Sequence, residues 1–242
     1  MKALILAGGF GKRLYPLTKK VSKCLLKVNG KPVIDYTFEK VVEIKEIKEV
    51  LVLTNDKFYN DFLKWSLKRD KVKLISNGIN SEKESRGALE NFFYSLFKEK
   101  INDDILVLGG DNVFDFSLKD AFRNFKKSGL DLAIFSDVKS INEAKRLGVI
   151  TEKNGIITNF EEKPRNPKST ICSTCMYFFK KETLDFIKKH RHDLIKKGTH
   201  IGFLLEYLYK KIPIKAYIVD KNIDIGTPES LKEARLFSRR RL

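Results

Sequence analysis

The sequence contains no glutamine and only three cysteines among its 242 residues. An odd number of cysteines favours a reducing compartment over a disulfide framework. The longest apolar runs, such as residues 3–7 and 105–108, have about five residues, whereas a membrane-spanning helix needs roughly 20. The apolar stretch at the N-terminus is too short for the core of a signal peptide. We therefore expect a cytoplasmic protein with no membrane partner.

Charge is strongly unbalanced, because 48 Lys and Arg outnumber 31 Asp and Glu and give a net charge of +17. With 42% hydrophobic residues the chain can bury a core, which excludes disorder and collagen-like repeats. A basic chain favours polyanionic ligands, and residues 239–241 resemble a basic tail. Aromatic residues are not interleaved with the basic ones, so a nucleic-acid binder stays a remote alternative and we expect no nucleic-acid partner.

Short β-rich runs alternate with segments of helical apolar spacing from the first residue onwards. The predicted strands are 2–7, 49–53, 72–75, 105–108 and 130–135, and the predicted helices are 33–45, 56–67, 87–98 and 118–127. Parallel strands need crossover helices, so this order predicts an α/β fold with a Rossmann-like, mostly parallel central sheet and helices on both faces. Ligands of such sheets bind at the carboxyl ends of the strands.

The pattern becomes more mixed after residue 140. Asn154-Gly155 is typical of a tight hairpin turn between strands at 148–151 and 156–160. The remaining predicted elements are strands at 176–179 and 214–219 and helices at 183–190, 201–210 and 228–237. No linker rich in Pro, Gly or Ser divides the chain. We expect one domain over residues 1–242, built from a nucleotide-type half (1–140) and a smaller mixed half (141–242).

A glycine-rich turn follows the first predicted strand, with the sequence Leu6-Ala7-Gly8-Gly9-Phe10-Gly11-Lys12-Arg13. Glycines let backbone N–H groups approach a polyanion, and the two basic residues add positive charge there. Leu14 stands where a dinucleotide fingerprint needs its third glycine, and no P-loop sequence occurs. The turn, with Lys23 a few residues further on, therefore predicts a different kind of phosphate-binding loop.

Acidic residues stand at three places that suit ligand binding. Asp111 follows the strand at 105–108, where a carboxylate is well placed to hold Mg²⁺, although a lone Asp there is also a common turn residue. Asp224 lies in a strand-like run just before Thr227-Pro228, which is typical of a helix start. Two distant carboxylates of this kind could share one metal. Glu162-Lys163 ends a strand, and an edge salt bridge is its structural alternative.

The cysteine pair and the histidines have simpler interpretations. Cys172 and Cys175 have C-x-x-C spacing, but no second pair completes a zinc site, so we interpret them as small side chains at the start of a strand. His190 and His192 lie in a basic stretch that is typical of a solvated helix end, and His200 is treated in the same way.

Taken together, the motifs resemble those of the sugar-1-phosphate nucleotidylyltransferases, also called sugar-nucleotide pyrophosphorylases. The motifs, in chain order, are GGxGxRLxPLT at 8–18, Lys23, GKP at 30–32, GGDN at 109–112, GV at 148–149, EKP at 162–164 and DIGT at 224–227. The pattern of motifs is most similar to that of glucose-1-phosphate thymidylyltransferases, with mannose-1-phosphate guanylyltransferases next. The resemblance covers nearly the whole chain and implies transfer of a nucleotidyl group from a nucleoside triphosphate to a sugar 1-phosphate, releasing pyrophosphate.

The resemblance also implies a role for particular residues. Arg13 would stabilise the departing pyrophosphate, Lys23 would contact phosphate oxygens, and Asp111 and Asp224 would hold Mg²⁺. Lys163 would hold the sugar phosphate. The nucleotide would contact Leu6, Ala7, Gly8, Gly9, Gly11, Lys12, Arg13 and Gly87. The sugar phosphate would contact Gly148, Glu162 and Lys163. The implied catalytic set is Arg13, Lys23, Asp111 and Lys163.

Some positions depart from the family pattern. Lys12 and Cys24 replace the usual small residue and proline, which leaves the charged residues intact. Arg86 and Cys175 fall near the implied base and sugar sites, so the identity of the base and of the sugar stays open, with uridylyl or guanylyl transfer as alternatives. A non-catalytic regulatory relative is a further alternative that the intact charged residues disfavour. A symmetric homo-oligomer is the default expectation for such a protein.

Overall fold

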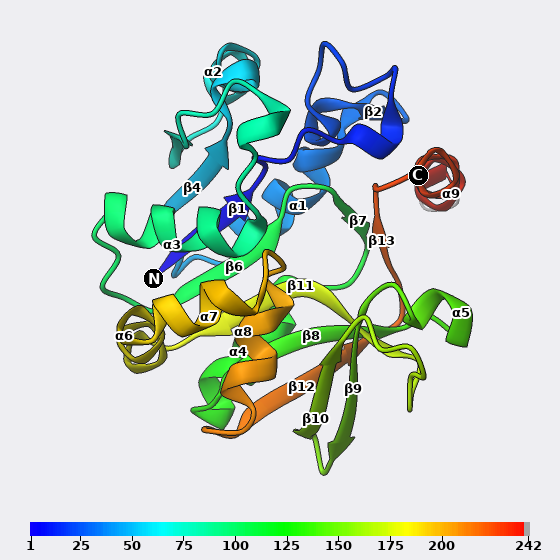
Figure 1. The fold of residues 1–242 in the computed structure, drawn as a ribbon. Coiled ribbons are helices and arrows are strands. Elements are labelled where there is room, and N and C mark those ends of the chain that lie inside the picture. The colour runs from blue at the N-terminus through cyan, green and yellow to red at the C-terminus, as the bar shows by residue number, and fades with distance from the viewer. Residues whose placement is uncertain (240–242) are drawn as a thin grey trace.

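A computed structural model of the chain describes residues 1–239, and it is an α/β structure built on one nine-stranded sheet (Figure 1). Arg240 and Arg241 of the predicted basic tail lie outside the described residues. The strand order in the sheet is β5-β4-β1-β6-β11-β8-β12-β10-β9. In chain order these strands are β1 (Lys2–Leu6), β4 (Glu49–Thr54), β5 (Val72–Ser76), β6 (Ile105–Gly109), β8 (Asp131–Asp137), β9 (Gly148–Lys153), β10 (Ile156–Glu162), β11 (Ile171–Phe179) and β12 (Ile214–Val219).

The sheet is mostly parallel, as predicted. Strands β5, β4, β1 and β6 are parallel neighbours, and β12 pairs in parallel with β8. Strand β11 is antiparallel to both β6 and β8, and the β9–β10 hairpin adds an antiparallel edge. The turn of this hairpin has positive φ at both Asn154 (54°) and Gly155 (75°), which is the geometry that an Asn-Gly turn favours.

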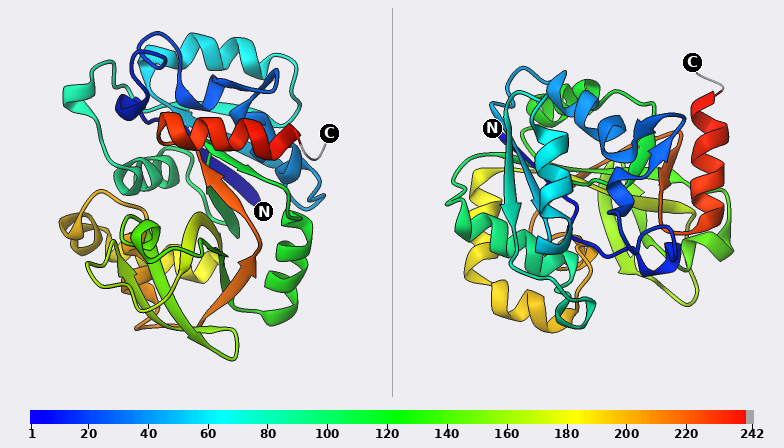
Figure 2. Two further views of the ribbon diagram at one scale, coloured as in Figure 1. Left: turned by 90° about the vertical axis from the view of Figure 1, so that its right-hand side faces the viewer. Right: turned by 90° about the horizontal axis from the view of Figure 1, so that it is seen from above.

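Helices cover both faces of the sheet because alternate strand residues point to opposite sides. Ile5, Val50 and Val52 pack on one face with α1 (Val33–Val42), α2 (Tyr59–Ser66) and α4 (Leu118–Ser128). Leu4, Leu51 and Leu53 pack on the other face. The helices on that face are α3 (Ala88–Lys98), α6 (Lys181–Lys189), α7 (Arg191–Lys197) and α8 (Gly202–Leu208). Figure 2 shows these two helical layers around the sheet.

A smaller layer returns the C-terminal segment to the first strands. Strand β13 (Asn222–Asp224) pairs with β7 (Asn112–Phe114), and α9 (Pro228–Arg239) packs beside β2 (Lys27–Val28). Ile223, Ile225 and Leu231 share an apolar cluster with Leu14 and Val28. The layer therefore holds residue 224 close to the end of β6 and to the glycine-rich turn.

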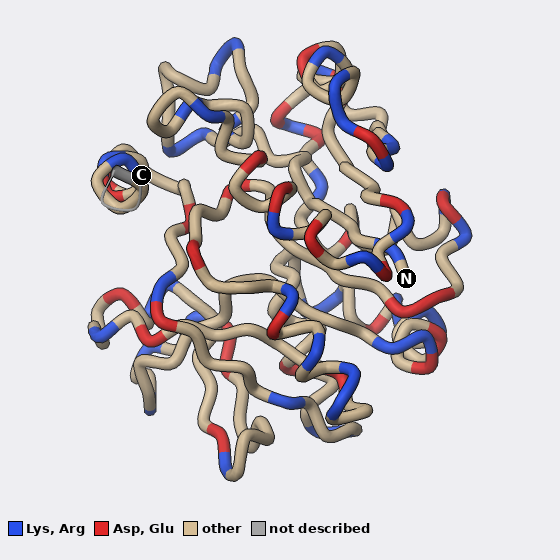
Figure 3. Tube along the Cα trace, turned by 180° about the vertical axis from the view of Figure 1, so that it is seen from behind, with Lys and Arg blue, Asp and Glu red and all other residues tan. Residues whose placement is uncertain are grey.

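The remaining short elements connect the layers. They are β3 (Lys31–Pro32), α5 (Ile141–Ala144) and four 3₁₀ turns, η1 (Lys12–Leu14), η2 (Lys23–Leu25), η3 (Asp56–Phe58) and η4 (Glu82–Glu84). Within residues 1–239 the structure has no helix with the length and hydrophobicity needed to cross a bilayer. Figure 3 shows Lys and Arg scattered over many elements and interspersed with Asp and Glu, so the net positive charge is not concentrated on one element.

Two differences from the sequence-based prediction are informative. Strand β11 begins at Ile171, five residues before the predicted start at 176, and a bulge between Ser173 and Met176 interrupts its pairing with β8. Helix α7 was not predicted, because its sequence is mostly basic and buries only Leu194. His190 lies between α6 and α7, so the basic stretch joins two helices and is not a single frayed end.

Candidate functional site

The glycine-rich turn lies between the carboxyl ends of β4 and β6. The Ala7 N–H donates to the Leu53 carbonyl (2.8 Å), and the Gly110 N–H donates to the Leu6 carbonyl (3.0 Å). The buried Asn55 side chain donates to the Gly8 carbonyl at 3.1 Å. A Cβ on Gly8 would lie 3.0 Å from the Leu53 side chain, so a larger residue would force this packing apart. The turn is therefore held by neighbouring strands as well as by its own glycines.

The second part of the turn presents its two basic side chains outwards. Gly11 has φ of 65° at the start of η1, and the Thr18 hydroxyl donates to its carbonyl at 2.8 Å. Lys12 and Arg13 are both exposed. The Arg13 guanidinium packs against Gly226, where an added Cβ would come within 2.7 Å of it. Arg13 therefore joins the glycine turn to the segment that carries Asp224.

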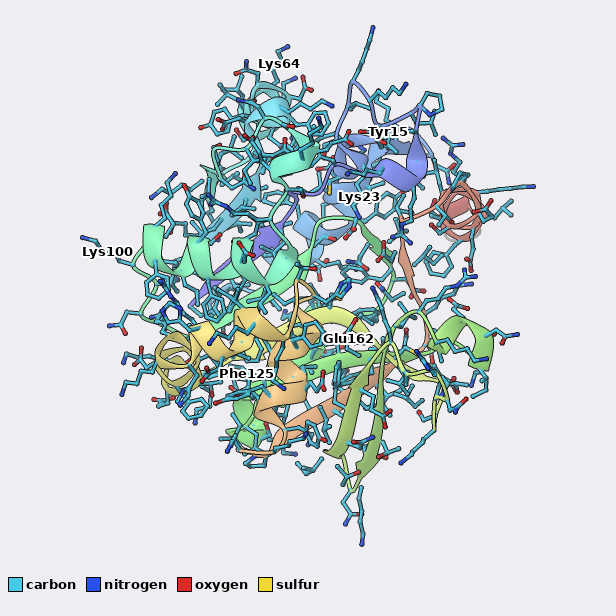
Figure 4. All side chains as sticks on the ribbon, in the orientation of Figure 1. Tyr15, Lys23, Lys64, Lys100, Phe125 and Glu162 are labelled. Carbon is cyan, nitrogen blue, oxygen red and sulfur yellow. The ribbon has the colours of Figure 1, made fainter. Side chains whose placement is uncertain are left out.

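Lys23 and Asp111 form an ion pair at the end of β6, and their side chains are only 18% and 15% exposed. Desolvation alone would lower the pKa of Lys23, but the carboxylates of Asp111 and Asp224 outweigh it and raise this pKa above its ordinary value. In Figure 4, Lys23 lies above the centre of the molecule, near the start of β7. The lysine therefore stays charged and neutralises part of the negative charge here.

Asp111 and Asp224 come from distant parts of the chain to one place. The Ile225 N–H donates to the Asp111 carbonyl at 2.8 Å, and Asp224 pairs with Asn112 across β13 and β7. Desolvation and the charge of Asp111 raise the pKa of Asp224, while Lys23 and Arg13 oppose this rise. Two carboxylates that repel one another are stabilised by a cation between them.

This donor set suits Mg²⁺ when the ligand supplies further oxygens. Among residues 1–239 no group of three or more His, Cys, Asp or Glu side chains is arranged to hold a metal ion. Mg²⁺ is commonly bound by one or two carboxylates together with substrate phosphates and water. Asp111 and Asp224 therefore fit a Mg²⁺ that arrives with a phosphate ligand.

Glu162 occupies a space that two glycines leave open. A Cβ on Gly202 would lie 1.9 Å from the Glu162 carboxylate oxygen Oε2, and one on Gly148 would lie 3.0 Å from it. Burial raises the pKa of Glu162 to about 7, with Lys163 opposing and Glu206 adding to the rise. Its carboxylate is half-buried and has no salt bridge with the residues that the structure describes. Figure 4 places Glu162 below the level of Lys23.

Lys163 adopts a left-handed backbone conformation, with φ of 53°, and its N–H donates to the Leu147 carbonyl at 3.0 Å. Such a conformation at a non-glycine residue costs of order 1–3 kcal/mol and is common at binding sites. The exposed ammonium Nζ lies 2.8 Å from Nε2 of His200. Sequence reasoning missed this contact, since His200 lies 37 residues further along the chain.

Gly87 packs directly on the segment that carries His200. The Leu89 N–H donates to the Thr199 carbonyl at 3.1 Å, and a Cβ on Gly87 would lie 2.4 Å from that carbonyl oxygen. The start of α3 is thus fixed against the loop between α7 and α8. Arg86 is exposed and lies 5.7 Å from the centre of the Tyr94 ring.

The cysteines differ in environment. Cys172 is buried among Val149 and Ala144, whereas Cys175 is exposed in the β11 bulge with φ of 58°. The two halves of the chain that carry the Lys23–Asp111 pair and Glu162 meet where Gly87 packs on Thr199.

An open, mostly parallel sheet with a glycine-rich turn, a Lys–Asp pair and two adjacent carboxylates at its strand ends defines a protein that binds nucleotides. The profile of the family described as "Nucleotidyl transferase" matches residues 2–241. The chain belongs to this family, and within it to the sugar-1-phosphate nucleotidyltransferases.

Two curated relatives match almost the whole chain. The UTP–glucose-1-phosphate uridylyltransferase AglF of Haloferax volcanii is 28% identical over 97% of this chain and 95% of its own length. A glucose-1-phosphate thymidylyltransferase of Neisseria meningitidis is 30% identical over 98% of this chain and 82% of its own length. The chain spans about half (53%) of a longer relative, the bifunctional protein GlmU of Methanocaldococcus jannaschii.

Solved structures share the fold. A provisionally assigned glucose-1-phosphate thymidylyltransferase from Bacillus anthracis, in complex with sucrose, has a TM-score of 0.83 at 25% identity and covers 99% of this chain and 95% of its own. A UDP-glucose pyrophosphorylase with bound UDP-glucose has a TM-score of 0.84 at 18% identity and covers 100% and 99%, which shows the likeness of the fold alone.

Proposed function

We propose that the protein transfers a nucleotidyl group from a nucleoside triphosphate to a sugar 1-phosphate, and that glucose 1-phosphate and dTTP are the leading substrates. The observation that carries this proposal is the pairing of two phosphate-binding regions in one site. One region holds Lys23, Asp111 and Asp224 beside the glycine-rich turn, and the other holds Glu162 and Lys163. The packing of Gly87 on Thr199 supports their closeness, because Thr199 adjoins His200, which contacts Lys163.

The reaction proposed is a direct displacement. A phosphate oxygen of the sugar 1-phosphate forms a bond to the α-phosphorus, and the bond from this phosphorus to the oxygen bridging to the β-phosphate breaks. Two anions have to approach one another, and two unit charges 4 Å apart repel by about 4 kcal/mol at an effective dielectric constant of 20. The protein therefore contributes mainly positioning and positive charge.

At the nucleotide region, the backbone of residues 8–11 contacts the triphosphate, together with Leu6, Ala7 and Lys12. Arg13 stabilises the negative charge that develops on the departing pyrophosphate. Lys23 exchanges its contact with Asp111 for one with phosphate oxygens. Asp111 and Asp224 would hold Mg²⁺, which when bound would offset phosphate charge as a Lewis acid. Gly87 lets the start of α3 approach the base.

At the second region, Lys163 holds the phosphate of the sugar, and Glu162 accepts hydrogen bonds from sugar hydroxyls. Gly148 allows the sugar to lie close to the backbone of β9. In this proposal residues 1–140 bind the nucleotide and residues 141–242 bind the sugar phosphate. Both substrates are intracellular metabolites, which favours the cytoplasm as the place of action.

The choice of base and sugar has a second candidate. The uridylyltransferase AglF matches 95% of its own length to this chain, so transfer of a uridylyl group is the next proposal after thymidylyl transfer. Guanylyl transfer to mannose 1-phosphate follows, because a mannose-1-phosphate guanyltransferase of Xenopus laevis is 30% identical over 78% of this chain.

A matrix assay tests the proposal. Each of dTTP, UTP, GTP, CTP and ATP is combined with glucose, mannose, galactose or N-acetylglucosamine 1-phosphate, and pyrophosphate release is measured with and without Mg²⁺. We expect one or two combinations to exceed the others by at least about tenfold, and chelation of Mg²⁺ to abolish release. A folded protein that releases pyrophosphate with no combination would contradict the proposal and favour a non-catalytic relative.

A further inference from the structure

The contact between Lys163 and His200 joins two segments that are distant in the sequence. Lys163 directly follows β10, and His200 lies in the loop between α7 and α8. Their nitrogens Nζ and Nε2 lie 2.8 Å apart, and both side chains are exposed. An ammonium can only donate, so Nε2 of His200 accepts the hydrogen bond and the imidazole is neutral, with its proton on Nδ1.

The loop that carries His200 is held in place from several sides. The Thr199 carbonyl accepts from the Leu89 N–H at the start of α3. The Phe203 ring lies 6.2 Å from the imidazole, measured between ring centres, and Gly202 packs on the Glu162 carboxylate. The imidazole is therefore placed by the fold at the ammonium of Lys163, although it is exposed to solvent.

Lys163 has an unused capacity for an anion. Among residues 1–239 no carboxylate oxygen lies within salt-bridge distance of its ammonium, whose partner is a neutral imidazole. Lys163 directly follows the end of β10 and has a left-handed backbone with φ of 53°. When an ammonium and an imidazole lie side by side, both can donate hydrogen bonds to the same phosphate dianion.

We propose that His200 is a second binding residue for the phosphate of the sugar 1-phosphate, and that it takes up a proton when this dianion binds. The inference rests on the proposed function and extends it to a residue outside the resemblance. In the free protein His200 accepts from Lys163. In the complex both nitrogens donate to phosphate oxygens, and the proton that His200 gains comes from solvent.

The charges around His200 agree with this linkage. Desolvation and the Lys163 ammonium lower the pKa of His200 in the free protein, and a bound dianion opposes both effects. The other charged groups on the elements next to this loop include Lys196 and Lys197 at the end of α7, Glu162 at the end of β10, Glu206 on α8, and Arg86 before α3. Because the bound form has the higher pKa, affinity rises as the pH falls from about 8 to 6.5, above the second ionisation of the phosphate itself.

Three variants separate the roles of His200. His200→Gln keeps an acceptor for Lys163 but cannot gain a proton, and His200→Lys supplies a permanent charge. His192→Gln is the matched control, because this exposed histidine lies on α7. The ligand is the sugar 1-phosphate of the four-sugar panel above that gives the highest rate.

For His200→Gln we expect KM for the sugar 1-phosphate to rise about 5- to 30-fold, with kcat and KM for the nucleotide within about twofold. Titration calorimetry at pH 7 in HEPES and in Tris should show proton uptake for the wild type and His192→Gln, and none for the two His200 variants. His200→Lys should recover most of the affinity and lose its pH dependence.

Equal KM and equal proton uptake in the wild type and His200→Gln would overturn the inference, even when the wild type turns over normally. Wild-type affinity for the sugar 1-phosphate in His200→Gln would also overturn it, because His200 would then act only by positioning Lys163. A wild type that neither binds nor turns over any sugar 1-phosphate would instead contradict the proposed function.

Discussion

The two regions of the site differ in how their charges are compensated. At the nucleotide region, the Lys23 ammonium is largely buried and paired with Asp111. At the region proposed to bind the sugar phosphate, neither Lys163 nor Glu162 has a salt bridge within residues 1–239, and Lys163 contacts a neutral imidazole. The first region holds an assembled ion pair, whereas the two charged side chains of the second have no ion-pair partner among the described residues. The first region is thus preorganised by its ion pair, and the second offers charged groups to a ligand.

The first region should be the more sensitive of the two to loss of a single charge. Asp111→Asn removes the partner of Lys23 and one of the two carboxylates proposed to hold Mg²⁺. We expect kcat to fall by about 10³-fold or more, because charge stabilisation at the transferring phosphate is lost. Pyrophosphate release measures this effect, and near-ultraviolet circular dichroism checks that the variant is folded.

Asp120→Asn is the control for Asp111→Asn, because Asp120 pairs with Arg123 on the exposed surface of α4. Its rate should stay within about twofold of the wild type. If Asp111→Asn kept more than a tenth of the wild-type rate, the assignment of Asp111 to the metal would be wrong.

The second region should respond to shape. In Gly202→Ala the new Cβ would stand 1.9 Å from Oε2 of Glu162. The carboxylate is the end of a flexible side chain, so it can move aside and the fold survives. Its displacement should raise KM for the sugar 1-phosphate about 10- to 100-fold and leave KM for the nucleotide within about threefold.

A double variant distinguishes crowding of Glu162 from other effects of Gly202→Ala. Glu162→Asp shortens the side chain, so adding Gly202→Ala to it should cost much less than it costs the wild type. Additive effects on KM would show that Gly202 acts through something other than Glu162.

The uncompensated charge of Glu162 should also appear in stability. Its pKa is raised to about 7 in the folded protein, above its ordinary value of 4.5, so stability is highest below pH 4.5 with respect to this group and is lost as the pH rises through 7. Glu162→Gln removes this loss. We expect the variant to be about 2 kcal/mol more stable than the wild type at pH 8 and nearly equal at pH 5, measured by urea unfolding. The same difference at both pH values would contradict the burial of an unpaired carboxylate.

Sequence reasoning worked best where local chemistry determines structure. The strand runs near 2–7 and 105–108 form adjacent parallel strands, which brings the glycine turn and Asp111 to one sheet edge. Asn154-Gly155 forms the predicted turn because few other residues accept positive φ at both positions. The family resemblance implied that Asp224 and Asp111 share a metal, but the pairing of β13 with β7 that brings them together was visible only in the structure.

Sequence reasoning failed where a contact depends on the path of the chain. His200 follows a basic stretch with the composition of a solvated surface, and its partner Lys163 lies on another element. In the sequence Gly202 suggests only a weak start of a helix. The folded structure shows that its missing Cβ makes room for Glu162. Both are residues of the sugar-phosphate region, where loops rather than parallel strands bring groups together.

The smallest effect should come from the exposed cation of the nucleotide region. Lys12 is 60% exposed and lies 3.5 Å from Glu82, so solvent screens both this pair and any contact with a triphosphate. Lys12→Ala should raise KM for the nucleotide about two- to fivefold at low salt, and the difference should fade at about 0.5 M salt. Kinetics at two salt concentrations, with Glu82→Ala as the control, measure this. A loss of 100-fold that persists at high salt would place Lys12 with Lys23 among the preorganised charges, and the division between buried and screened cations would not hold.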